Sequence, residues 1–146
     1  MTRPLLVAAS ALAAVVLTGC NGQTSDPYQL SVGQCLLNAD TTGLVDEVDS
    51  VECSEPHAAE VFASITAQST ADSPDTYPGK DDLERQAGAC AARFADFIGK
   101  PYEESDLEIT YFHPTEDSWD RGDRQILCIV SVPTGTVTGS LEGSTR

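Results

Sequence analysis

The residue best suited to chemistry in this sequence is His57, which follows Pro56 and lies four positions after Cys53. An imidazole can act as a base, a metal ligand or a pH-sensitive contact. A catalytic triad, however, requires partners for the histidine, and no such set is evident around this residue. We therefore favour a histidine whose ring satisfies polar groups of the turn beside Cys53.

Divalent-metal binding is the alternative for the two histidines. His57 and His113 could share an ion if the fold brought them together, a closeness that sequence does not establish. Glu60 or Asp123 would then add a carboxylate. Zinc held by cysteines is disfavoured because no C-x-x-C pair occurs. We assign no metal and no cofactor, and keep ion or small-ligand binding as the second hypothesis.

A polar loop from Pro114 to Asp123 carries further candidate contacts. Trp119 is either a lid on the core or an exposed anchor for a partner, and the large area that a tryptophan buries favours the core. We expect the arginines of the loop region to pair with its acids: Arg121 and Arg124 with Asp120 and Asp123. The candidate binding residues are thus His57, Glu60, Trp119, Asp123 and Arg124.

Catalytic signatures are missing from the sequence. No G-x-S-x-G nucleophile elbow occurs. The neighbouring acids Asp81-Asp82 and Glu103-Glu104 are adjacent in sequence, whereas the two carboxylates of a glycosidase face each other across a bond. Every cysteine has another assignment, given below, so a thiol nucleophile is disfavoured. We expect a protein that is not an enzyme and has no catalytic residues.

The N-terminus has the three parts of an export signal. Arg3 is followed by an apolar run from Leu5 to Leu17, which is short for a membrane span. The run ends in Leu17-Thr18-Gly19-Cys20, which resembles the lipobox of bacterial lipoproteins. The resemblance implies removal of residues 1–19 and lipidation of Cys20, with 20–29 as a polar tether.

Size and charge limit the function classes. Removal of residues 1–19 from the 146 leaves 127, enough for one domain. The formal charge of −15 becomes −16 when Arg3 is lost. Such an excess of acids repels nucleic acid, so we expect no nucleic-acid partner.

Four cysteines remain after lipidation of Cys20, and an even number in an exported chain suggests two disulfides. Three pairings are possible. We favour Cys35–Cys53, which closes a short local loop, with Cys90–Cys128, which would join a helix to a strand.

Hydrophobic periodicity predicts the elements that position these residues. Apolar residues at helical spacing predict one helix over 82–98, begun by a capping box of Asp81 and Glu84 and ended by Gly99. Strands are predicted near 28–37, at 60–67 with Val61, Ala63 and Ile65 on one face, at 107–112 and, as a buried middle strand, at 125–132. Residues 133–146 are expected to be irregular or frayed. The fold class is α+β, a mainly antiparallel sheet with one long helix packed on one face.

Three ordered patterns resemble the septum-formation-related domain of actinobacterial lipoproteins and membrane proteins: Val32-Gly33-Gln34-Cys35-Leu36, the run from Val51 to Phe62 that contains Cys53-Ser54-Glu55-Pro56-His57, and Trp119-Asp120-Arg121-Gly122-Asp123-Arg124 ahead of Cys128. Cys90 and Thr138-Gly139-Ser140-Leu141 are also similar. The likeness places a septum-formation-like domain at 30–142, with 143–146 as a tail. It implies an extracytoplasmic, disulfide-bearing domain and no defined catalytic mechanism.

The sequence thus predicts an envelope protein on the extracytoplasmic face of the cell membrane. Lipid on Cys20 would hold it there. Its expected role is non-enzymatic binding of an envelope protein partner in septum formation or a related process.

Overall fold

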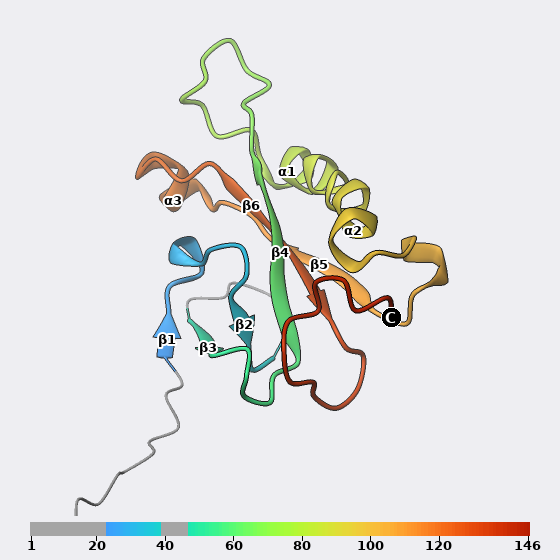
Figure 1. Cartoon of the computed structure of the whole chain (residues 1–146). Coiled ribbons are helices and arrows are strands. Elements are labelled where there is room, and N and C mark those ends of the chain that lie inside the picture. The colour runs from blue at the N-terminus through green and yellow to red at the C-terminus, as the bar shows by residue number, and fades with distance from the viewer. Residues whose placement is uncertain (1–22, 39–46) are drawn as a thin grey trace, which may run out of the picture.

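The computed structural model describes residues 23–38 and 47–146, so the predicted signal segment and Cys20 lie outside the described residues. An antiparallel sheet has the strand order β1-β3-β2-β4-β6-β5 (Figure 1). Its strands are β1 (Gln23–Ser25), β2 (Cys35–Leu36), β3 (Val48–Val51), β4 (Ala59–Thr66), β5 (Glu108–Phe112) and β6 (Gln125–Ser131). The helices are η1 (Pro27–Gln29), α1 (Lys80–Ala87), α2 (Cys90–Ile98), η2 (Tyr102–Glu104) and α3 (Glu116–Asp120).

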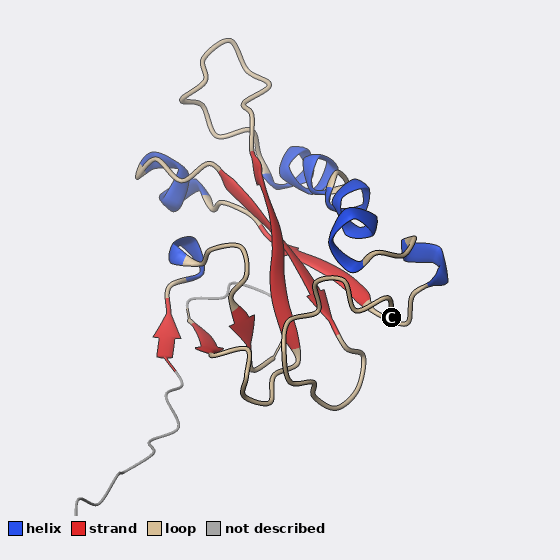
Figure 2. Ribbon diagram, in the orientation of Figure 1, coloured by secondary structure: helices blue, strands red, loops and turns tan. Residues whose placement is uncertain are grey.

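The α+β prediction is confirmed. The helical segment α1–α2 covers one face of a curled sheet (Figure 2). In the strand order, β1, β3 and β2 are on one side of β4, and β6 and β5 are on the other. β6 pairs with both β4 and β5, and every residue from Ile126 to Ser131 is buried. The run 125–132 is therefore a buried inner strand, as its apolar sequence predicted. None of the helices in the described ranges combines the length and apolar character needed to cross a membrane.

β4 changes face part-way along, which the alternation of its sequence does not predict. Val61 pairs with Ile129 but Ala63 pairs with Cys128, so Phe62 is an extra residue, a β-bulge. Because of it, Val61 packs in the cluster beneath β2 and β3, whereas Phe62 and Ala63 contact the cluster beneath the helices. The prediction that Val61 shares a face with Ala63 is wrong for this reason.

The predicted helix is present but bent. α1 and α2 are separated by Gly88 and Ala89, whose amides bond to carbonyls only three residues earlier. Gly79 occupies the N-terminal cap with no side-chain bond, so the capping box predicted for Asp81 is wrong. Gly99 ends α2 with a φ of 83°, as predicted.

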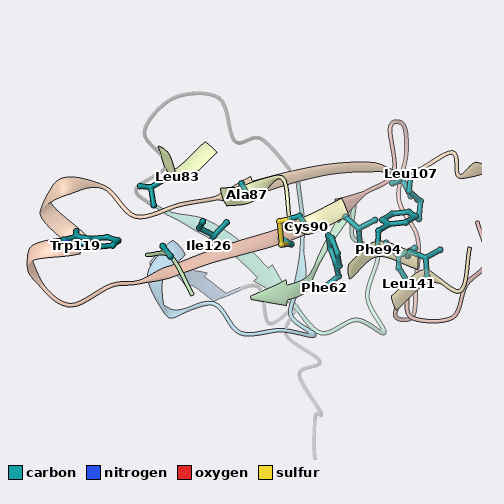
Figure 3. Packing of buried hydrophobic residues seen from close by; sticks show 14 residues of the cluster. Phe62, Leu83, Ala87, Cys90, Phe94, Leu107, Trp119, Ile126 and Leu141 are labelled. Carbon is teal, nitrogen blue, oxygen red and sulfur yellow. A yellow bond between two sulfur atoms is a disulfide. The ribbon is translucent and has the colours of Figure 1, made fainter. Parts of the chain in front are cut away.

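Two hydrophobic clusters lie on the two sides of the central strands. The larger fills the space between the sheet and the α1–α2 segment, with Trp119 at one end and Leu107 and Leu141 at the other (Figure 3). The disulfide Cys90–Cys128 crosses it from α2 to β6. The smaller cluster is enclosed by β2, β3 and β4 and contains Leu30, Leu36, Val48, Ala59, Val61, Leu127 and Ile129. Both predicted disulfide pairings are confirmed, the second bond being Cys35–Cys53.

Both ends of the described chain are held to the domain. Within the predicted tether, Gln23–Ser25 forms β1, the edge strand beside β3, with Ser25 and Ser50 in hydrogen-bond contact. At the other end, the amide of Gly143 donates to the carbonyl of Phe97 at 2.8 Å, and that of Thr145 donates to Ile98 at 3.0 Å. The tail is irregular, as expected, but these bonds prevent the expected fraying.

Candidate functional site

His57 is completely buried at the entrance to β4. Its backbone pairs with Val137 of the C-terminal segment. Its ring nitrogen Nδ1 lies 2.8 Å from the carbonyl oxygen of Glu55, and because a carbonyl only accepts, Nδ1 carries the hydrogen. This bond confirms that the ring satisfies the turn beside Cys53. The second ring nitrogen, Nε2, is buried and has no hydrogen-bond partner among the described residues.

Glu60 is also buried, with 1% of its surface exposed. One carboxylate oxygen accepts a hydrogen bond from the Ser140 hydroxyl at 2.8 Å, and the other accepts from the amide of Leu141 at 2.7 Å. Within residues 23–38 and 47–146, no lysine, arginine or histidine forms an ion pair with this carboxylate. The C-terminal segment therefore covers Glu60 and supplies its hydrogen bonds without supplying a charge.

A third donor atom lies beside these two residues. One ligand atom each of Cys35, His57 and Glu60 fall within 4.8 Å of one another, and all three residues are buried. Cys35 is bonded to Cys53 in this structure, so its sulfur is not a thiolate. The group differs from the predicted metal set because it contains a cysteine in place of the second histidine.

The structure does not bring the two histidines together. Ala59 and Glu108 both pair with Ser131, so β4 and β5 begin at the same end of the sheet. His57 lies at that end, whereas His113 follows the last residue of β5 at the opposite end. A site shared by His57 and His113 is therefore ruled out by the strand register.

The predicted polar loop contains α3, which begins with a capping box between Thr115 and Ser118. Trp119 is 1% exposed and its Nε1 donates to the carbonyl of Asp75 at 2.9 Å, so the core prediction is confirmed. The guanidinium of Arg124 lies 3.7 Å above the tryptophan ring centre and also donates to the Trp119 carbonyl.

The predicted ion pairs of this loop are wrong. Arg124 makes its ion pair with Asp75, at 3.9 Å, in the part of the chain that the structure describes. Asp123 instead accepts hydrogen bonds from the Ser118 hydroxyl and the amide of Gln125. Asp123 is therefore held by hydrogen bonds within its own loop. A carboxylate next to an arginine in the sequence need not face that arginine in the fold.

A surface hollow of about 400 Å³ lies between η1 and the turn that joins α3 to β6. Its lining residues are Asp26, Tyr28, Gln29, Ser118, Arg121, Gly122, Asp123, Arg124 and Gln125. Two of the five candidate binding residues, Asp123 and Arg124, are therefore at a concave surface, while the other three are buried. Sequence reasoning missed Tyr28, whose hydroxyl donates to Thr115 across 87 positions of sequence. No local signal could reveal that contact.

The phenol of Tyr77 packs against Trp119 and has a raised pKa. Their rings meet edge to face with centres 6.0 Å apart, and the Tyr77 hydroxyl donates to the carbonyl of Pro114. Burial, together with the nearby charge of Glu116 and the phenol of Tyr28, raises the pKa of Tyr77 above its usual value near 10.

We expect an alkaline titration of tyrosinate absorbance to show one of the four tyrosines ionising later than the rest. Above pH 10 the unfolded chain loses this proton while the folded chain keeps it, so the Tyr77 shift should lower stability as pH rises. Tyr77→Phe should remove the late step. Four coincident transitions would contradict the expectation.

Comparison with known proteins places the chain in a family. A family model described as "Septum formation" matches residues 32–145, which includes both disulfides, the His57–Glu60 centre and the α3–β6 turn. No curated protein and no solved structure matches the chain. The matched range covers more than half of the 146 residues. The chain therefore belongs to the septum formation family.

Proposed function

We propose that the protein is an envelope protein that binds a protein partner during septum formation and catalyses no reaction. Family membership supports a role connected with the septum and the cell envelope. The two disulfides are consistent with an extracytoplasmic location, since such bonds persist in oxidising compartments. The lipobox-like sequence ending at Cys20 supports a lipid anchor on the outer face of the membrane.

The observation that carries the proposal of partner binding is the hollow between η1 and the α3–β6 turn. Its floor is fixed, because Arg124 stacks on buried Trp119 and Asp123 is held by Ser118. At its rim Arg121 is exposed. Its backbone amide donates to the Ser118 carbonyl, but its guanidinium forms no hydrogen bond or ion pair with the rest of the described chain. A guanidinium in this position can bind a carboxylate through two parallel bonds. Lys and Arg total only 8 against 23 Asp and Glu, so the molecule has few cations with which to bind an acidic partner.

Arg121→Glu places a like charge against the carboxylate of the partner, so it should weaken partner binding by about 2 kcal/mol or more, roughly 30-fold in affinity. In dividing cells, the full-length variant with a fluorescent tag should lose its enrichment at the septum. A photoreactive side chain at position 121 should crosslink to one partner in cells that carry the native protein.

Arg93→Glu is the matched control, because Arg93 is also exposed but lies on α2, away from the hollow. It should keep septal enrichment. Cys20→Ser separates anchoring from recognition, since it should release the protein from the membrane while the hollow stays intact. If Arg121→Glu and Arg93→Glu are equally enriched at the septum, the hollow is not the partner-binding surface. If the wild-type protein shows no septal enrichment, the septal role is contradicted.

Divalent-ion binding is the second candidate function. One specific observation favours it: in the described part of the molecule, a buried carboxylate without a paired cation lies close to a buried histidine, and one ring nitrogen of that histidine has no hydrogen-bond partner.

A further inference from the structure

The Glu60 carboxylate is in an unusual electrostatic position. A buried charge is costly unless it is paired with an opposite charge or bound to a metal. Glu60 has its hydrogen bonds from Ser140 and Leu141, but no ion pair is formed with it by any described residue. A cation seated between Glu60 and its neighbours would supply the missing charge.

The His57 ring is already arranged as a metal ligand would be. Histidines that bind metals donate their other ring N–H to a carbonyl or carboxylate, which fixes the tautomer and the ring orientation. Nδ1 of His57 donates to the Glu55 carbonyl, so the lone pair of a neutral ring is on Nε2. That nitrogen is buried and has no hydrogen-bond partner in the described chain. It is therefore available to a metal ion.

Cys35 completes a set of three, but only after its disulfide opens. As a thiolate it would join a histidine nitrogen and a carboxylate oxygen, a donor set that suits zinc rather than calcium or magnesium. Cys53, whose sulfur is bonded to Cys35 in this structure, is a candidate for the fourth position. With the disulfide closed, only His57 and Glu60 remain as good ligands.

The two disulfides differ in access. Cys35 and Cys53 line a surface hollow of about 160 Å³ with Gly33, Val51 and other residues, and Cys53 is partly exposed. Cys90 and Cys128 are 1% and 0% exposed, inside the cluster beneath the helices. A reductant can thus reach Cys35–Cys53 while Cys90–Cys128 is still protected.

We propose that reduction of Cys35–Cys53 by a dithiol creates a zinc site formed by Cys35, His57 and Glu60. One thiolate of the dithiol attacks Cys53, the S–S bond breaks and Cys35 leaves as a thiolate. The second thiol of the reductant then displaces Cys53, so the dithiol is oxidised to a disulfide and two electrons pass to the protein. The protons of the cysteine thiols are released when zinc binds the thiolates.

This inference develops the second candidate function and does not depend on partner binding at the hollow between η1 and the α3–β6 turn. It also connects the metal with the C-terminal segment, because Ser140 and Leu141 would orient the ligating carboxylate from outside the ligand shell. Ser140 is exposed, so it can be changed without a cavity in the core.

The test is zinc affinity of the full-length mature protein with Cys35–Cys53 closed and after its selective reduction, measured by competition with a chromophoric chelator. We expect one zinc ion per reduced chain, bound at least about 100-fold more tightly than by the oxidised chain, since even loss of an outer-shell partner costs roughly 10- to 100-fold. Cobalt in place of zinc should show a thiolate-to-metal charge-transfer band.

Three variants test the site in the reduced protein. His57→Gln should abolish tight binding, Ser140→Ala should weaken it about 10-fold, and His113→Gln, the matched control at the other end of the sheet, should bind zinc as the native chain does. If His57→Gln does not fold, the cobalt band and Ser140→Ala still test the site. If the oxidised and reduced chains bind zinc equally tightly, the dependence on disulfide reduction is overturned while ion binding stands. If neither chain binds zinc, both are overturned.

Discussion

Removal of the Cys90–Cys128 disulfide by a double change to alanine is expected to lower the free energy of unfolding by about 4 kcal/mol. The bond closes a loop with a sequence separation of 38 residues, so its loss returns considerable freedom to the unfolded chain. It also joins α2 directly to the buried strand β6, across the larger hydrophobic cluster. Urea unfolding followed by circular dichroism measures the loss.

The other disulfide provides the comparison. Cys35–Cys53 spans only 18 positions, so its double alanine variant should lose about 3 kcal/mol, less than the first pair. Cys53 is also partly exposed, so its removal leaves less empty space in the interior. A larger loss for Cys35 and Cys53 than for Cys90 and Cys128 would contradict this order.

Trp119→Ala should destabilise the domain by about 3–5 kcal/mol. The side chain is almost fully buried between Tyr77 and Arg124, and it donates to the Asp75 carbonyl. Its removal leaves a cavity below α3 and deprives the Arg124 guanidinium of the ring on which it stacks. Thermal and urea unfolding, both followed by circular dichroism, measure the effect.

Trp119→Phe separates packing from hydrogen bonding, because phenylalanine keeps an aromatic ring but loses the Nε1 donor. Trp119→Phe should lower the free energy of unfolding by clearly less than Trp119→Ala does. The Asp75 carbonyl, left without its donor, contributes at most about 1–3 kcal/mol to that loss. Equal losses for the two variants would mean that the cavity contributes little. Such a result would contradict the role of Trp119 as the end of the hydrophobic cluster.

Periodicity predicted those elements that bury many apolar residues. β5, β6 and the α1–α2 segment follow because their apolar positions recur at spacings of two or of three and four. The bulge at Phe62 was not predictable, since the alternation around it continues unchanged in the sequence. β1 was missed for another reason: Gln23–Ser25 is polar and is a strand only because the edge of β3 supplies partners.

The candidate site was predictable only in part. His57 and Glu60 are three positions apart on the path into β4, so a shared environment follows from local sequence. Ser140 and Leu141 come from about 80 positions away, and no pattern in the C-terminal segment indicates that they bond to Glu60. The start of α3, in contrast, had a local signal in the sequence: Thr115 is a common cap residue, and two acids, Glu116 and Asp117, follow it in the first turn.

If lipid on Cys20 anchors the chain as proposed, the position of β1 sets how far the domain can stand from a bilayer. With lipid on Cys20, only residues 21 and 22 separate the anchored residue from Gln23, the first residue of β1. Three peptide steps span at most about 10 Å, so the β1–β3 edge would lie at the level of the lipid head groups. A partner that reaches the hollow beside η1 would then have to approach close to the membrane surface, which favours the juxtamembrane part of another envelope protein over distant cell-wall material.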